Sequence, residues 1–225
     1  DHIDTSQLKI DKDAKTGVAF VWVDTEGHNK CVCSLGVNAR VTPQDVQSYA
    51  HLFTDSSIVM TTLEHSSQLL EEISLMARQN NCILIVDPSS KDYSKLSPEI
   101  AGRIDILKPN EVETEMLTGV RVETEKDAVQ AIHILKEKGI RMPVISLGSR
   151  GVVYEYKGRV TSVEGLRVNA VDTTAAGDTF IGSMAAKLSQ GYSFRESIDY
   201  ANRAAAYCVQ HRGAQISIPF EENVL

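Results

Sequence analysis

The sequence predicts an α/β fold: a mostly parallel, doubly wound sheet with helices on both faces and a small β-hairpin beside it. Short apolar runs alternate with helical patterns from residue 57 onward, which is typical of parallel sheets built from strand-helix-strand units. The run Cys82 to Val86 (CILIV) is apolar throughout, as expected of a strand that is buried on both faces. Earlier in the chain, two strand-like runs surround a short turn, which indicates a hairpin.

The hairpin is predicted within residues 16–36. Thr16 to Val23 is rich in β-branched and aromatic residues, and Asn29 to Leu35 follows a turn that contains Asp and Gly. Because no helix separates these runs, we expect the hairpin to be an appendage of the main sheet. No linker-like segment divides the chain, so we expect residues 1–225 to form a single α/β domain.

The remaining elements follow from the spacing of apolar residues and from capping signals. In chain order, the sequence predicts a helix over 43–53 capped by Thr42, a strand over 57–61, a helix over 63–79, strands over 82–86 and 104–107, helices over 110–117 and 123–138, a strand over 143–147, paired strands over 152–156 and 158–162, and helices over 179–190 and 194–211. Strands thus alternate with helices along most of the chain.

Composition excludes several classes of protein. The 225 residues carry a net charge of −7 with no basic run longer than two, which argues against nucleic-acid binding. The sequence predicts neither a membrane span nor a signal peptide. We expect free thiols in a cytoplasmic protein, with a disulfide or a zinc site as the alternative, from four cysteines that lack metal-ligand spacing: Cys31, Cys33, Cys82 and Cys208.

The segment from Val171 to Phe180 (VDTTAAGDTF) carries the strongest functional signal. Three small residues, at 175–177, precede Asp178 where helical spacing begins. Unpaired N–H groups at a helix N-terminus attract anions, and small side chains let a phosphate approach the backbone. A carboxylate beside an anion site is unfavourable because the two negative charges repel each other. Such a carboxylate therefore indicates a functional role, such as taking a proton from an attacking hydroxyl group. Helix capping alone is the alternative interpretation.

The full string DTTAAGD resembles the signature of the ribokinase-like family of carbohydrate kinases, and its double alanine is most similar to the ribokinases. This resemblance implies a ribokinase-like fold in which residues 16–36 are part of a β lid. It implies that Asp178 is a general base that contacts the substrate. It also implies that the backbone N–H groups of Ala175, Ala176 and Gly177 cradle the phosphoryl group during transfer.

Ligands of parallel sheets bind beyond the carboxyl ends of the strands, so we expect Asp87, Asn110, Gly148 and Asp178 at one edge. Asn110 and Glu113 lie three residues apart on a predicted helix, where an amide and a carboxylate can address one Mg²⁺ through its waters. A helix N-cap with an acid in the first turn is the alternative. The pair also resembles the second motif of the family, which implies a role with Mg²⁺ and phosphate.

The segment Ser146 to Gly151 (SLGSRG) is predicted as a strand followed by a turn with two glycines, and a tight turn without a ligand is the alternative. It matches neither the Rossmann nor the Walker pattern. The family resemblance places this segment beside the adenine nucleotide. It implies ATP-binding roles for Asn110, Ser146, Leu147, Gly148, Arg150, Gly151, Gly177 and Asn202.

The resemblance extends to ion and sugar contacts. The ending from Arg212 to Pro219 resembles that of ribokinases, which implies a K⁺ activator beside the anion site; a segment that merely closes the fold is the alternative. The implied K⁺ ligands are Asp172, Thr174, Val209, Arg212 and Ser217. The implied sugar contacts are Glu64, Ala19 and Val21, although Glu64 also fits an exposed residue at a helix start.

These implications predict a kinase that uses ATP, Mg²⁺ and K⁺ to convert a sugar, by preference ribose, to its phosphate. A kinase of the same family for fructose, 2-keto-3-deoxygluconate or a nucleoside is one alternative, and a non-catalytic nucleotide-binding remnant is another. The family pattern begins with a sugar-binding strand and a glycine pair that this sequence does not contain, so we expect it to be incomplete at its N-terminus. The lid hairpin implies a possible homodimer.

Overall fold

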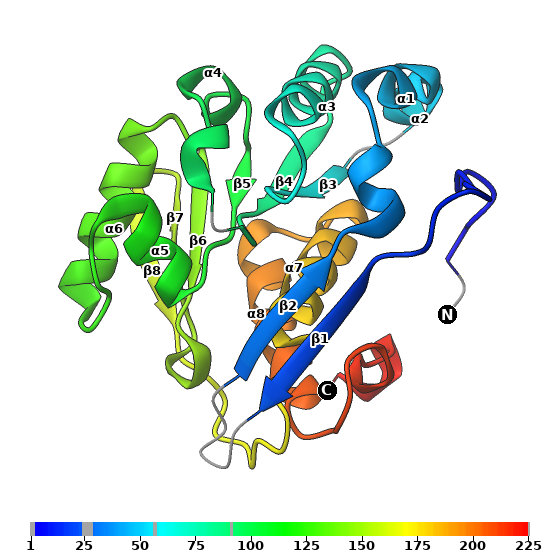
Figure 1. The fold of residues 1–225 in the computed structure, drawn as a ribbon. Coiled ribbons are helices and arrows are strands. Elements are labelled where there is room, and N and C mark those ends of the chain that lie inside the picture. The colour runs from blue at the N-terminus through cyan, green and yellow to red at the C-terminus, as the bar shows by residue number, and fades with distance from the viewer. Residues whose placement is uncertain (1–2, 24–28, 56–57, 91, 225) are drawn as a thin grey trace.

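The computed structural model describes residues 3–23, 29–55, 58–90 and 92–224. Its centre is a six-stranded sheet in which the strands follow one another in sequence order (Figure 1). The strands are β3 (Ile58–Thr62), β4 (Ile83–Asp87), β5 (Ile106–Leu107), β6 (Met142–Ser146), β7 (Val152–Tyr156) and β8 (Arg159–Val163). β3 to β6 are parallel, whereas β7 and β8 are antiparallel to their neighbours, so the predicted mostly parallel sheet is confirmed.

Helices cover both faces of this sheet. Because parallel crossovers are right-handed and the strands keep their sequence order, the helices between β3 and β6 fall on one face. These are α3 (Ser67–Gln79), α4 (Pro98–Ala101), α5 (Glu111–Thr118) and α6 (Glu125–Glu137). The opposite face is covered by α7 (Ala176–Ser189) and α8 (Phe194–Cys208), which lie side by side (Figure 1).

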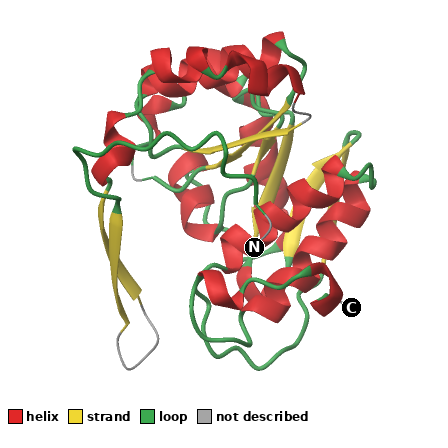
Figure 2. Ribbon diagram, turned by 90° about the vertical axis from the view of Figure 1, so that its right-hand side faces the viewer, coloured by secondary structure: helices red, strands yellow, loops and turns green. Residues whose placement is uncertain are grey.

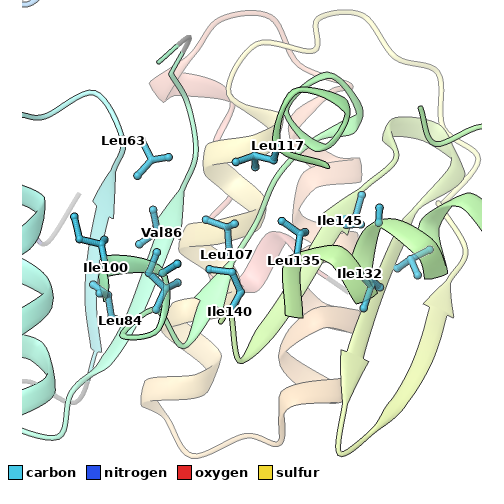
Figure 3. Close-up of a cluster of buried hydrophobic side chains, with 14 of the residues drawn as sticks. Leu63, Leu84, Val86, Ile100, Leu107, Leu117, Ile132, Leu135, Ile140 and Ile145 are labelled. Atoms are coloured by element: carbon cyan, nitrogen blue, oxygen red, sulfur yellow. The ribbon is translucent and has the colours of Figure 1, made fainter. Parts of the chain in front are cut away.

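Each face has its own hydrophobic core. Along β4, Leu84 and Val86 point into one core while Ile85 points into the other, as the alternation of a strand requires. The first core contains side chains from α3 to α6 (Figure 3), among them Leu70, Ile100, Leu117, Ile132 and Leu135. The second contains side chains from α7 and α8, among them Phe180, Ile181, Met184, Ile198 and Ala201. The predicted burial of the CILIV strand on both faces is confirmed.

The hairpin forms a separate two-stranded antiparallel sheet of β1 (Val18–Val23) and β2 (Asn29–Ser34). It projects away from the body of the protein (Figure 2), and the predicted turn between its strands lies outside the described residues. Phe20 pairs with Val32 across the strands, and Phe20 and Trp22 are each 59% exposed. The hairpin therefore presents an apolar face that the described part of the chain leaves uncovered.

Two predicted helices are shorter than expected, because α6 begins at Glu125 rather than at 123 and α8 ends at Cys208 rather than at 211. Three other predicted helix boundaries are corrected. The helix expected over 43–53 is divided into α1 (Pro43–Ser48) and α2 (Ala50–Asp55). α3 begins at Ser67 rather than at 63, because the Ser66 hydroxyl accepts the N–H of Leu69 at 3.2 Å and caps the helix there. The third correction, at the start of α7, bears on the functional site and is described below.

The described helices include none that is both long enough and apolar enough to cross a membrane. Of the four cysteines, Cys82 and Cys208 are buried and Cys33 is exposed. Within the described residues, no group of three His, Cys, Asp or Glu side chains is arranged to hold a metal ion. This gives no support to the alternative of a zinc site.

Candidate active site

The N-terminus of α7 differs from the predicted start at Thr179, because Ala176 and Gly177 already belong to the helix. Its N-cap residue, Ala175, has a left-handed backbone with φ of 62° and provides no side-chain hydrogen bond. Non-glycine residues adopt this conformation rarely and at a cost. The N–H of Ala176 donates to the carbonyl of Thr173 at 3.3 Å. Because the helix begins without a side-chain cap, the N–H groups that follow in its first turn are available to an anion.

The carboxylate of Asp178 lies in this first turn and is exposed. The next residue, Thr179, is buried, and its hydroxyl group has no hydrogen-bond partner within the described residues. The sequence therefore places an exposed carboxylate and open backbone donors within one turn of helix. This geometry suits a proton acceptor beside a bound phosphate.

A buried ion pair lies directly beside this helix start. The Lys108 ammonium lies 2.9 Å from Oδ2 of Asp87, and both residues are buried. A Cβ atom at Gly177 would lie 3.1 Å from Nζ of Lys108, so the absent side chain leaves room for the ammonium group. Asp87 was expected at this edge from its position in the sequence, but its partner was not predicted. The available signal was a charged residue at the carboxyl end of each of two neighbouring buried strands: Asp87 is the last residue of β4, and Lys108 directly follows β5.

Asn110 and Glu113 form a capping box at the start of α5. The Asn110 side chain accepts the N–H of Glu113 at 2.9 Å, and the Glu113 carboxylate accepts the N–H of Asn110 at 2.8 Å. The capping interpretation of this motif is therefore confirmed. Burial raises the pKa of Glu113; the Asp87 carboxylate adds to this increase, and the Lys108 ammonium opposes it. The capping box thus lies within electrostatic reach of the Lys108–Asp87 pair.

The same cluster contains an unsatisfied phenol. Within the described residues, the hydroxyl of Tyr93 is buried without a hydrogen-bond partner. Burial, with a contribution from Glu113 and Asp87, raises its pKa to about 12. Two carboxylates and an unsatisfied hydroxyl group fit a hydrated Mg²⁺, which binds proteins through one or two carboxylates and keeps waters and phosphate oxygens as its other ligands. The described residues alone do not form a complete metal cage.

The segment 146–151 lies next to the start of α5, because the N–H of Ser146 donates to the carbonyl of Pro109 at 2.9 Å. Residues 148–150 form a short 3₁₀ turn, and the N–H of Leu147 donates to the carbonyl of Gly151 at 2.8 Å. Gly148 and Gly151 have positive φ, and a Cβ atom at Gly151 would lie 2.0 Å from the carbonyl oxygen of Val163. The glycines are therefore required by the turn itself, which holds the segment at the carboxyl edge of the sheet.

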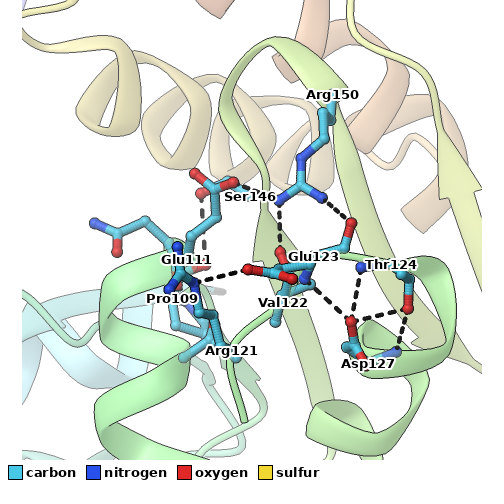
Figure 4. A network of polar contacts seen from close by, with 11 residues as sticks. Pro109, Glu111, Arg121, Val122, Glu123, Thr124, Asp127, Ser146 and Arg150 are labelled. Atoms are coloured by element: carbon cyan, nitrogen blue, oxygen red, sulfur yellow. Dashed lines mark hydrogen bonds and ion pairs between the residues drawn. The ribbon is translucent and has the colours of Figure 1, made fainter.

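Arg150, a predicted ATP ligand, is occupied by other contacts (Figure 4). Its guanidinium group forms an ion pair with Glu111 and donates to the backbone carbonyls of Val122 and Glu123 at 2.6 and 2.8 Å. It thereby ties the turn to α5 and to the segment that leads into α6. Asn202 has a comparable role, since it is buried on α8 and donates from Nδ2 to the carbonyl of Glu164 at 2.8 Å.

The predicted potassium ligands are brought together beside the start of α7. The Asp172 carboxylate accepts the N–H groups of Thr174 and Gly213 at 2.9 and 3.0 Å, and these bonds lower its pKa to about 2. The carbonyl of Val209 accepts two N–H groups, from Val171 and Asp172. Two hydrogen bonds use both lone pairs of a carbonyl oxygen, so Val209 does not fit the role of a cation ligand.

Of two other predicted potassium ligands, Ser217 and Arg212, the first takes part in closing this segment. The Ser217 hydroxyl is buried and donates to the carbonyl of Ala214 at 2.7 Å, while Arg212 is exposed at the surface. The segment 208–217 is thus fastened to residues 172–174 by contacts among protein groups. These contacts support the interpretation in which the segment closes the fold.

The predicted sugar contacts lie in different places. Glu64 is exposed just beyond the carboxyl end of β3, and its N–H donates to the Thr62 hydroxyl at 3.3 Å. Thr62 is the register partner of Asp87, so Glu64 lies at the same sheet edge as the ion pair. Ala19 is exposed on the projecting hairpin, and the side chain of Val21 lies outside the described residues. The structure therefore brings Glu64, but not the hairpin, to the sheet edge.

Comparisons with known proteins agree with this arrangement. A family model described as pfkB family carbohydrate kinase matches residues 1–221. The chain is 35% identical over 223 residues to a ribokinase of Haemophilus influenzae, covering 99% of the chain and 72% of that relative. It is 34% identical to a ribokinase of Staphylococcus aureus, covering 99% and 73%. A solved Arabidopsis thaliana ribokinase in complex with ribose and ATP has a TM-score of 0.84 at 27% identity, covering 94% of this chain and 69% of its own.

The fold and the sequence thus define a carbohydrate kinase. This chain belongs to the pfkB family of carbohydrate kinases. Within that family, ribokinases are among the relatives to which it is similar along nearly its whole length.

Proposed function

We propose that this protein is an ATP-dependent sugar kinase that transfers the γ-phosphoryl group of ATP to a hydroxyl of ribose, forming ribose 5-phosphate. The observation that carries the proposal is the start of α7, where Ala175 offers no side-chain cap, Gly177 leaves the backbone open and Asp178 is exposed. Such a helix end attracts an anion, and the adjacent carboxylate can accept a proton. Similarity to ribokinases along the chain supports ribose as the acceptor.

In this mechanism Asp178 is the general base. Its carboxylate takes the proton of the attacking hydroxyl while the sugar oxygen bonds to the γ-phosphorus, and the bond from that phosphorus to the β,γ-bridging oxygen breaks. The backbone N–H groups at Ala175, Ala176 and Gly177 stabilise the charge on the transferring group. Phosphoryl transfer requires mainly positioning and charge stabilisation, and these groups contribute to both.

The ATP would lie along the segment 146–151 and the start of α5, with Asn110 nearby. Arg150 and Asn202 support this site indirectly, because their side chains fix the surrounding loops. Glu113 and Asn110 would hold Mg²⁺ through its waters, and the ion supplies neutralisation of phosphate charge when bound. K⁺, the activator that the resemblance implies, would be held beside the start of α7 by Asp172, Thr174, Arg212 and Ser217. The Val209 carbonyl already accepts two N–H groups and would not take part.

The sugar would contact Glu64 and Asp178 at the sheet edge, with Ala19 and Val21 approaching from a lid formed in part by residues 16–36. The solved Arabidopsis thaliana relative is a complex with ribose and ATP, which supports this pair of ligands for the present chain. The proposal includes a single domain over 1–225, a cytoplasmic location, no nucleic-acid partner and a homodimer joined through the hairpin. The exposed apolar face of the hairpin favours such pairing.

The proposal is tested by incubating the protein with Mg²⁺ and ATP in the presence of ribose, fructose, 2-keto-3-deoxygluconate or a nucleoside, and measuring ADP release. We expect ribose to give the highest kcat/KM. Asp178→Asn is expected to lower kcat by about 10²–10⁴-fold while ATP binding is retained. Asp199→Asn, which removes the partly buried carboxylate of the Arg195–Asp199 ion pair on α8, serves as the matched control. ATP binding without sugar-dependent turnover would instead identify a non-catalytic nucleotide-binding protein.

A further inference from the structure

We propose that Lys108 is a further residue of the transfer site. Its ammonium group holds the γ-phosphoryl group of ATP, and Asp87 positions that ammonium group. This inference rests on the proposed function. It assigns a role to a buried charge that neither the sequence motifs nor the general base account for.

The first argument is the burial and the incomplete satisfaction of the ammonium. Lys108 is 3% exposed, and its Nζ lies 2.9 Å from the Asp87 carboxylate. An ammonium group has three N–H donors, and within the described residues Asp87 is the only side chain that pairs with it. A buried cation with unused donors is unfavourable unless another acceptor reaches it.

Lys187 provides a comparison within the same protein. It is also buried, lies on α7 and pairs with a carboxylate, that of Glu221. Its ammonium additionally contacts Gln190 at 3.0 Å and lies over the rings of Tyr192 and Tyr200, at 4.7 and 4.5 Å from their centroids. Lys187 is therefore satisfied by protein groups, as a structural lysine would be. Within the described residues, the Lys108 ammonium has only the Asp87 carboxylate as a side-chain partner.

The second argument is the position of the ammonium. Its Nζ would lie 3.1 Å from a Cβ atom at Gly177, so it occupies space next to the first turn of α7. A helix N-terminus carries partial positive charge, and a cation placed beside it is repelled. The Lys108 ammonium and the N-terminus of α7 are therefore two positive groups next to each other, and Asp87 neutralises only the ammonium. A phosphoryl group, with its negative oxygens, would interact favourably with both.

The position of Lys108 is also consistent with the bonds that form and break in the transfer step. The proton of the sugar hydroxyl goes to Asp178, the new phosphorus-oxygen bond forms, and the bond to the bridging oxygen breaks, leaving ADP. Lys108 gains and loses no proton in this step. Its ammonium group attracts the negatively charged transferring group and donates an N–H to one of the oxygens of that group.

The inference predicts a specific loss in Lys108→Met. In the absence of sugar, affinity for ATP is expected to fall about tenfold while affinity for ADP, which lacks the γ-phosphoryl group, is retained. In the presence of the acceptor sugar, kcat is expected to fall by about 10²-fold. Lys187→Met, the matched control, is expected to retain both the ratio of ATP to ADP affinity and kcat.

A merely structural role is distinguished by the double variant Lys108→Met/Asp87→Asn, which removes both buried charges. If Lys108 only neutralises Asp87, the double variant regains the ATP preference and the rate of the wild type, and the inference is overturned. If Lys108 holds the phosphoryl group, the double variant folds but remains impaired. Calorimetric titration with ATP and ADP measures the ATP preference even if the protein does not turn over a sugar. Failure of the proposed function would therefore appear as absent turnover, whereas failure of this inference would appear in the ATP preference. Equal ATP preference in Lys108→Met and wild type would also overturn the inference.

Discussion

Gly177→Ala is expected to raise the stability of the protein slightly and to lower its activity. In α7 an alanine is more favourable than a glycine by about 1 kcal/mol, because glycine loses more backbone entropy on folding. The new Cβ, however, would lie 3.1 Å from Nζ of Lys108, so the ammonium must move by about 0.3 Å to restore a normal contact. This displacement acts on the Lys108–Asp87 ion pair beside the proposed transfer site.

The magnitude follows from the geometry. Lengthening the 2.9 Å pair by about 0.3 Å lowers its attraction by about 0.5 kcal/mol at an effective dielectric constant of about 20. The gain in helix propensity is therefore about half cancelled. Gly182→Ala is the matched control, because Gly182 lies exposed on the same helix with nothing within 4 Å of an added Cβ. We expect the control to raise Tm by about 2–4 °C and Gly177→Ala to raise it by less.

Activity is expected to differ more than stability. Because the methyl group would occupy the approach of the phosphoryl group to the backbone, Gly177→Ala is expected to lower kcat with ribose by about 10²-fold. Gly182→Ala is expected to leave kcat unchanged. Thermal denaturation and a coupled ADP-release assay on both variants provide the measurements. Wild-type kinetics in Gly177→Ala would refute the reasoning that the open backbone at this position receives the phosphoryl group.

Two further predictions concern other parts of the chain. The pKa of Asp172 is lowered from 3.8 to about 2 in the folded state, so this carboxylate stabilises the protein above pH 3.8 and that stabilisation is lost as pH falls toward 2. Asp172→Asn should therefore unfold at lower urea concentration than wild type near pH 7, and the difference should shrink below pH 4; a constant difference would contradict the assignment. The double variant Phe20→Ser/Trp22→Ser should shift the sedimentation of the protein from dimer to monomer, whereas Val112→Ser, at an equally exposed apolar position on α5, should not. Equal sedimentation of all three proteins would exclude pairing through the hairpin.

Much of the fold could be predicted because its signals are local. Thr42 and Asn110 cap their helices as side-chain acceptors, and both were recognisable from the residues that follow. Thr124, which caps α6, was instead placed inside the helix predicted over 123–138. The start of α3 was predicted wrongly because Leu63 fits the apolar spacing, although it is buried after β3 and not in the helix. The start of α7 was missed because Ala175 caps without a polar side chain and leaves no signal in the sequence.

The functional site was only partly predictable, because only some of its residues belong to local sequence patterns. The motif at 172–178 identified the anion site, since small residues and an acid at a helix start are a local pattern. The contacts of Arg150 could not be anticipated, because an arginine in a turn is equally suited to a ligand and to backbone carbonyls. The unsatisfied hydroxyl of Tyr93 could not be anticipated either, since burial depends on elements distant in sequence.

The sequence by itself determined the type and order of the strands and of most helices, the edge of the sheet that carries the site and the family of the protein. The short helix α4 was not predicted. Periodicity, caps and turns act over a few residues, so they can be recognised before the chain folds. Only the tertiary structure decided that Lys108 meets Asp87 beside Gly177. That meeting depends on the parallel pairing of β4 with β5 and on the packing of α7, which no local pattern specifies. Charges separated in sequence interact only after strand order and helix packing have brought them within a few ångströms.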